Sequence, residues 1–148
     1  MPANPDYSDL FRILNEEAVE YLVIGAHAVM YYTVPRYTRD LDIWIKPVPE
    51  NAKKLWRALE TFGAPLRDLS LEDFCDQDCI YQIGVEPNRI DIIMGNAGLD
   101  FRGAYNECEE STYNGIPIKI VSKKDLIETK KRIDRKQDQI DVENLERK

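Results

Sequence analysis

Apolar positions repeat with two different periods along the chain, which predicts a mixture of helices and strands. Steps of three and four residues, typical of amphipathic helices, occur over residues 7–20 and 50–62 and twice more after Ser122, and the apolar run 26–32 is long enough for a buried helix. Short β-rich runs or alternation with period two occur over residues 21–25, 39–46, 79–85, 89–94, 110–113 and 116–121. We therefore expect six strands and five helices in one α/β (α+β) domain.

Turn signals separate these segments. Asn114-Gly115 predicts a tight hairpin, and Glu86-Pro87-Asn88 is short enough to join two antiparallel strands. Ser122, followed three residues later by Asp125, predicts a helix start. Residues 64–76 and 96–110 show no period and are expected to be irregular. The pattern favours one mixed, mainly antiparallel β-sheet flanked by helices, with residues 1–148 as a single domain that ends in a helical extension at about 122–148.

Three aspartates fall inside the predicted strands. Asp40 and Asp42 occupy positions i and i+2, so their carboxylates project from the same face. Asp91 lies in the otherwise apolar run 89–94, where an unpaired buried charge would be costly. Mg2+ or Mn2+ bound by the carboxylates would relieve the repulsion. Alternatively, Asp40 and Asp42 lie on a solvent-facing side of an antiparallel strand, and Asp91 is an edge-strand charge that discourages aggregation.

The turn Ile24-Gly25-Ala26-His27 connects a predicted strand to a predicted helix. Small residues let a ligand approach the backbone, and free N–H groups at a helix start attract anions such as phosphate. A single glycine at this place can equally serve only to allow a tight turn between strand and helix. His27 is the only histidine of the chain, and we weigh a supporting role at the helix start against a role as a catalytic base.

Composition excludes several classes of protein. No apolar run approaches the roughly 20 residues that span a bilayer, and the N-terminus resembles no secretion signal, so we expect a cytoplasmic protein without a membrane partner. The three cysteines match neither a zinc nor a redox spacing and are expected to be free thiols. The net charge of −7 argues against broad binding to nucleic acid, although residues 119–148 hold ten Lys and Arg against seven Asp and Glu.

The order of the motifs resembles a known superfamily. Gly25-Ala26-His27-Ala28, the segment 36–42 that contains Asp-x-Asp, and Ile90-Asp91-Ile92 are similar to the motifs of DNA polymerase beta-like nucleotidyltransferases. Within that superfamily the chain most resembles small AbiEii toxin-like nucleotidyltransferases. Their C-terminal pattern, Lys followed by Arg-x-Lys-Asp-x-x-Asp, is similar to Lys130 followed by residues 135–141.

The resemblance implies the nucleotidyltransferase fold and a division of roles among the aspartates. Asp40 and Asp42 would bind two metal ions, Mg2+ or Mn2+, that hold a nucleoside triphosphate (NTP) such as ATP. Asp91 would join the metal ion that activates the attacking hydroxyl. All three would then be catalytic and metal-binding residues.

The resemblance also implies nucleotide contacts at Gly25, Ala26, Thr38 and Lys130. Two positions depart from the pattern. Ala26 replaces a second Gly or a Ser, and Gln137 replaces a Lys.

Two functions follow from the resemblance. The first is an enzyme that transfers a nucleoside monophosphate from NTP to a hydroxyl of RNA, a protein or a small molecule, with pyrophosphate release, in a toxin-antitoxin or modifying role. The second is a catalytically inactive module of the same fold that acts through a protein partner, such as an antitoxin. Ala26 is the feature that favours the second function.

Overall fold

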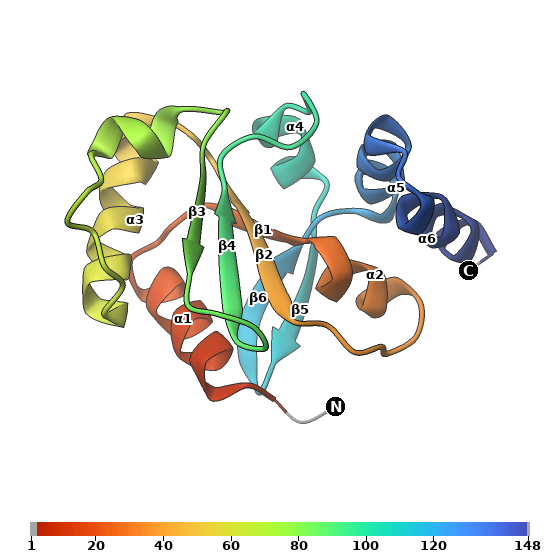
Figure 1. Ribbon diagram of the computed structural model, residues 1–148, viewed down its shortest axis with the longest axis horizontal. Helices are drawn as coiled ribbons and strands as arrows, with labels where there is room; N and C mark the ends of the chain where they lie inside the picture. Colours follow the sequence, from red (N-terminus) through yellow and green to blue (C-terminus); the bar gives the residue numbers. More distant parts are fainter. Residues whose placement is uncertain (1–2, 148) are drawn as a thin grey trace.

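The computed structural model describes residues 3–147, and its centre is a six-stranded mixed sheet in the order β3-β4-β2-β1-β6-β5 (Figure 1). Strand β1 pairs antiparallel with β2 and parallel with β6. Strand β4 pairs parallel with β2 and antiparallel with β3, and β5 forms an antiparallel hairpin with β6. The strands are β1 (Tyr21–Ile24), β2 (Asp40–Ile45), β3 (Ile80–Ile83), β4 (Arg89–Ile93), β5 (Glu109–Tyr113) and β6 (Ile116–Ile120).

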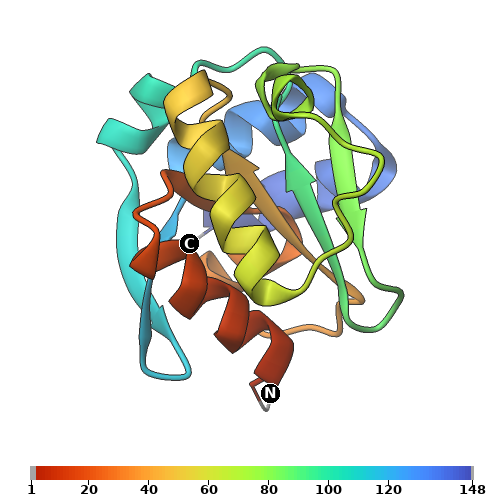
Figure 2. The ribbon, with the colours of Figure 1, turned by 90° about the vertical axis from the view of Figure 1, so that its left-hand side faces the viewer.

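Helices cover the sheet from both sides. Helices α1 and α3 lie together on one side and are in front of the sheet in Figure 2, while α2, α5 and α6 lie on the opposite side in Figure 1. The helices are α1 (Pro5–Glu16), α2 (Gly25–Tyr32), α3 (Pro49–Phe62), α4 (Phe101–Asn106), α5 (Lys123–Ile133) and α6 (Lys136–Arg147), with a 3-10 turn η1 (Leu71–Cys75). Within residues 3–147 no helix has the length and apolar character needed to cross a membrane.

Local sequence signals explain several helix ends. The Asn4 side chain accepts hydrogen bonds from the backbone N–H groups of Asp6 and Tyr7, and thereby caps α1. The Ser122 hydroxyl accepts the N–H of Asp125 at 3.1 Å, which confirms the predicted start of α5. Helix α3 ends at Gly63, whose φ of 93° lies in the left-handed region that favours glycine.

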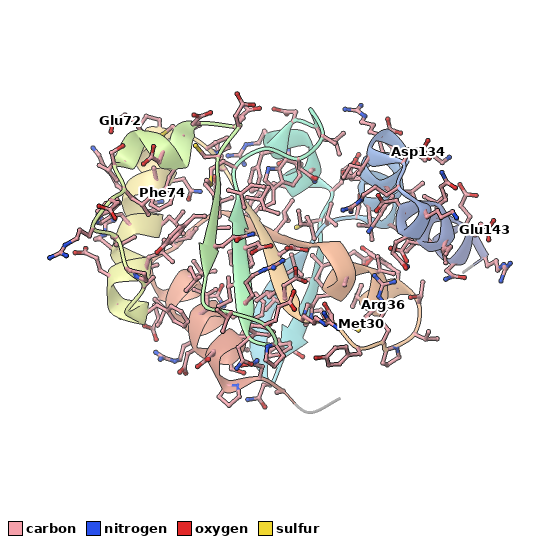
Figure 3. The ribbon with its side chains drawn as sticks, viewed as in Figure 1. Met30, Arg36, Glu72, Phe74, Asp134 and Glu143 are labelled. Atoms are coloured by element: carbon pink, nitrogen blue, oxygen red, sulfur yellow. The ribbon has the colours of Figure 1, made fainter. Side chains whose placement is uncertain are left out.

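The expected mixed sheet and flanking helices are confirmed, but three local predictions were wrong. Helix α1 ends at Glu16 instead of residue 20, because the chain turns at Ala18 with a φ of 57°. The segment 96–110, expected to be irregular, contains α4, which Asp100 caps and in which Phe101 and Ala104 are buried. In the segment 64–76, η1 buries Phe74 (labelled in Figure 3), whose ring packs against that of Trp56 of α3. Both missed helices are too short to show a helical period.

Candidate active site

The register between β2 and β4 brings four charged residues together. In this parallel pair Asp40 lies opposite Arg89, and Asp42 lies opposite Asp91. Because alternate residues of a strand share a face, all four side chains lie on the same side of the sheet. One carboxylate oxygen from each of Asp40, Asp42 and Asp91 lies within 4.8 Å of the others. The structure therefore brings together the three aspartates singled out from the sequence.

Neither alternative for these aspartates agrees with the fold. Strand β4 lies between β2 and β3, so Asp91 is not on an edge strand, and only 7% of its surface is exposed. Asp40 and Asp42 are partly buried on an interior strand rather than displayed on an open antiparallel face. Three carboxylates held this close need positive charge nearby.

The protein supplies part of that charge through Arg89. Its guanidinium donates to the Asp40 carboxylate at 2.7 Å and to both oxygens of Asp91 at 3.1 and 3.2 Å. The compensation is incomplete at Asp42. Burial, followed by the negative charges of Asp40 and Asp91, raises the pKa of Asp42 to about 7, although Arg89 acts in the opposite direction.

The donor set fits a hard divalent cation. It consists of carboxylate oxygens alone, which Mg2+ and Mn2+ prefer, and it offers one ligand atom from each of three side chains. A cation here would favour the charged form of Asp42, whose pKa burial and the two neighbouring carboxylates raise. Asp40, Asp42 and Asp91 are thus the residues that would hold such an ion.

Gly25 is required where it stands, at the turn from β1 into α2. Its φ is 68°, and a Cβ atom on it would collide with the carboxylate of Asp42. This close approach of backbone to carboxylate places the start of α2 directly beside the aspartates. A cavity of about 310 Å3 opens here, between the end of the sheet and α5, and Gly25, Asp42 and Lys130 all line it.

Ala26 and Thr38 lie on another side of Asp40. The Thr38 hydroxyl donates to the backbone carbonyl oxygen of Asp40 at 3.2 Å. Together with Arg36 and Gln137, these residues line an open depression of about 410 Å3. The carboxylates therefore separate a cavity toward α5 from a shallower depression toward α6.

Lys130 faces buried acids rather than the three aspartates. Its ammonium group lies 3.2 Å from Asp138 and 3.0 Å from Asp141, and both carboxylates are fully buried. Asp141 also pairs with Arg36 at 2.6 Å, from the segment between α2 and β2 that Figure 3 shows beside α6. Lys130 thus belongs to an ion cluster that links the two C-terminal helices to the segment preceding β2.

His27 lies in the first turn of α2, and its ring packs between two tyrosine rings. Its ring centroid is 5.6 Å from that of Tyr7 and 6.4 Å from that of Tyr113. Burial lowers the pKa of His27 more than the nearby Asp40 raises it. Among the described residues, its Nε2 is the buried side-chain polar atom for which no hydrogen-bond partner is found. This setting favours a packed, neutral imidazole over a catalytic base.

The sequence patterns did not single out Arg89 or the pairing of Arg36 with Asp141. Arg89 precedes Asp91 by two residues, so strand alternation alone could have placed it on the same face. The pairing of Arg36 with Asp141 joins residues 105 positions apart, and no local pattern signals it.

No family model matches the sequence, and no curated protein matches it. Solved structures do match the fold. The crystal structure of the lincosamide antibiotic adenylyltransferase LnuA with bound lincomycin aligns over 99% of this chain and 98% of its own, with a TM-score of 0.61 and 17% identity. The structure of ANT(2")-Ia in complex with adenylyl-2"-tobramycin aligns over 93% of this chain and 83% of its own, with a TM-score of 0.59 and 12% identity.

The chain has the nucleotidyltransferase fold. The fold expected from the sequence motifs is therefore confirmed by three-dimensional similarity that sequence comparison does not detect.

Proposed function

We propose that the protein is a metal-dependent nucleotidyltransferase that moves a nucleoside monophosphate from NTP to an acceptor hydroxyl. The observation that carries the proposal is the meeting of Asp40, Asp42 and Asp91 beside the Gly25 turn, on a fold shared with adenylyltransferases. A partly buried acidic triad next to a helix start matches the needs of phosphoryl transfer, in which positioning and charge neutralisation contribute most of the catalysis.

In the proposed reaction the hydroxyl oxygen of the acceptor attacks the α-phosphorus of NTP. The bond from that phosphorus to the bridging oxygen of the β-phosphate breaks, pyrophosphate leaves, and the hydroxyl proton passes to water. A bound divalent cation would neutralise phosphate charge and favour the deprotonated hydroxyl. Asp40 and Asp42 would hold the metal ions beside the phosphates, and Asp91 would join the one that activates the acceptor hydroxyl.

The nucleotide contacts are assigned to the start of α2 and its surroundings. The free backbone N–H groups at Gly25 and Ala26 would receive the β- and γ-phosphates, since those donors do not depend on a side chain. Thr38, beside Asp40, and Lys130, on the wall of the 310 Å3 cavity, are the secondary candidates. For Lys130 such a contact requires that it keep or share its partners Asp138 and Asp141.

We infer a small-molecule acceptor in preference to RNA or a protein. LnuA is a lincosamide antibiotic adenylyltransferase, and ANT(2")-Ia was captured with adenylyl-2"-tobramycin. A net charge of −7 disfavours RNA. The single domain of residues 1–148, the cytoplasmic location, the AbiEii toxin-like branch and a protein or antitoxin partner remain predictions from the sequence.

Pyrophosphate release tests the proposal. The protein is incubated with each NTP, Mg2+ or Mn2+, and panels of hydroxylated small molecules, including lincosamides and aminoglycosides, with total RNA and cell protein as separate acceptors. Pyrophosphate release with label on a small molecule is expected, and Asp91→Asn, which is close in shape, should abolish it without unfolding the chain. Label on RNA or protein would overturn the acceptor class.

The second candidate function, an inactive binding module, is favoured by the Ala26 methyl group. It predicts no pyrophosphate release with any acceptor. Metal binding is checked independently, because Mg2+ or Mn2+ should raise the melting temperature of the wild type and not that of the Asp40→Asn/Asp42→Asn double variant. An unchanged response in the double variant would place the metal elsewhere.

A further inference from the structure

We propose that Arg89 is a built-in counter-ion that occupies one side of the metal site, so that the nucleotide-free protein binds one divalent cation, between Asp40 and Asp42. A second cation enters between Asp40 and Asp91 only when bound NTP draws the guanidinium away. This inference rests on the proposed function, because it concerns how the same three carboxylates are loaded.

The contacts of Arg89 place its guanidinium where a bridging cation would otherwise be needed. A metal ion shared by Asp40 and Asp91 would require one oxygen from each. Arg89 donates to an oxygen of Asp40 at 2.7 Å and to both oxygens of Asp91, the nearer at 3.1 Å. A planar guanidinium with five donors is well suited to span two carboxylates in this way. The hydrogen bonds of Arg89 go to Asp40 and Asp91 and not to Asp42, which leaves Asp42 to the first cation.

The strands hold Arg89 in this place. Arg89 lies directly opposite Asp40 in the parallel register and two residues before Asp91 on the same strand face. Its side chain is 27% exposed, against 10% for Asp91. The guanidinium therefore lies at the solvent side of the site, over the more buried carboxylate, and can leave without unfolding a strand.

The charges of the site also indicate that one cation binds before NTP and the second binds with it. When all three carboxylates are ionised, they and Arg89 together carry a charge of −2, which one divalent cation neutralises. A second divalent cation would have to displace the guanidinium from both of its carboxylate partners, which is unfavourable until new negative charge offers Arg89 other partners. NTP brings that charge, and its phosphate oxygens are strong bidentate partners for a guanidinium.

The exposed side chain of Glu86 offers the Arg89 guanidinium an alternative ion-pair partner. The Arg89 guanidinium lies 3.5 Å from Glu86, whose side chain is 46% exposed and which also pairs with Arg39 at 3.3 Å. A small outward rotation toward Glu86 would clear the space between Asp40 and Asp91. Glu86, in the segment between β3 and β4, thus gives the arginine a partner when the second cation binds.

The stoichiometry of Mn2+ binding tests the proposal without any catalytic readout. Free Mn2+ is followed by electron paramagnetic resonance during titration of the wild type, of Arg89→Met, and of the control Arg39→Met, which removes a neighbouring cation that pairs with Glu86 but not with the aspartates. Wild type and Arg39→Met should bind one Mn2+, and Arg89→Met should bind two. A non-hydrolysable NTP analogue should bring the wild type from one bound Mn2+ to two, after subtraction of the Mn2+ that the analogue binds alone.

A variant that keeps the charge separates occupation of space from simple repulsion. Arg89→Lys retains +1 but presents a compact ammonium group that cannot span both carboxylates. It should bind two Mn2+ if the guanidinium blocks the site, and one if only its charge matters. It also serves if Arg89→Met fails to fold, which circular dichroism would show.

The outcomes separate this inference from the proposed function. One Mn2+ in Arg89→Lys, or two in the nucleotide-free wild type, would overturn the role of Arg89 while leaving a metal-dependent transferase intact. Absence of specific Mn2+ binding in wild type, Arg89→Met and Arg89→Lys would overturn the metal site itself, and with it both proposals.

Discussion

Replacing Lys130 with methionine should destabilise the protein strongly, because the lysine neutralises two carboxylates that have no access to water. Asp138 and Asp141 are both fully buried, at 3.2 and 3.0 Å from the ammonium group. Breaking a buried ion pair by removing one partner typically costs about 3–5 kcal/mol. Arg36 and Arg135 would remain 2.6 and 2.8 Å from these acids, so we expect about 3 kcal/mol, at the lower end of that range.

The loss is large enough to measure by thermal and urea unfolding. For a chain of this size, about 3 kcal/mol corresponds to a fall in melting temperature of roughly 6–12 °C. Lys131→Met is the matched control, since Lys131 is the next residue and pairs with Glu146 at 3.2 Å on the surface, where both side chains are more than half exposed. Such a surface pair contributes at most about 1 kcal/mol.

The pH dependence of the difference identifies its cause. Burial would raise the pKa of Asp138, but hydrogen bonds from Arg135 and Lys130 outweigh it and lower the pKa to about 2. A carboxylate with a lowered pKa stabilises the folded state above the pKa of the unfolded chain, roughly 3.9, and this stabilisation is lost as the pH falls through the folded value. The gap between wild type and Lys130→Met should therefore narrow from about pH 4 to pH 2.

One result would refute this reasoning. If Lys130→Met melts within about 2 °C of Lys131→Met while its NTP affinity falls, the ammonium group serves the triphosphate and the buried acids do not depend on it. A fall in both quantities would support the ion cluster and leave the nucleotide contact as a second role.

Three further outcomes are expected. Gly25→Ala should lower both the melting temperature and pyrophosphate release, because the new Cβ would collide with the Asp42 carboxylate. The control Gly63→Ala, at a φ of 93° with no atom within 4 Å of the new Cβ, should cost only the left-handed backbone strain of about 1–2 kcal/mol and leave pyrophosphate release unchanged. Equal effects of the two substitutions in both assays would contradict this. The pKa of Asp42 is raised to about 7, and below that pH a cation must displace a proton from its carboxyl group. The Mn2+ affinity measured by calorimetry should therefore be constant above pH 8 and fall about tenfold per pH unit below pH 7. An affinity that does not change with pH would show that Asp42 is not a metal ligand. Ala26→Gly and Ala26→Ser should change NTP affinity in equilibrium binding by no more than about 1–1.5 kcal/mol, and a silent wild type rescued by Ala26→Gly would establish the inactive module.

The sheet could be predicted from the sequence because each strand carries its own local signal. Alternation marked β2, and Asn114-Gly115 marked the hairpin of β5 and β6. The shared face of Asp40 and Asp42 followed from the same alternation. That Asp91 would stand opposite Asp42 did not follow from any local rule, since the register between strands 49 residues apart is set by tertiary packing.

The parts that could not be predicted depend on long-range contacts or very short elements. Helix α4 spans only six residues, too few to show a helical period. Lys130 was assigned to the nucleotide from its place in a motif, whereas its buried partners on α6 became visible only when α5 and α6 were packed together. Arg89 was overlooked although its spacing from Asp91 was as informative as that between Asp40 and Asp42.

The parallel alignment of β2 with β4 makes the site more sensitive to chain length than to chemical composition. A single residue inserted into β4 ahead of Asp91 would turn that carboxylate to the opposite face, toward the apolar side chains that alternate with it. An insertion of two residues would restore the face but move Asp91 away from Asp42 by one alternate position, near 7 Å. Deletions and duplications within these two strands should thus be excluded from functional variants, while the loops between them, such as residues 64–70, can vary in length.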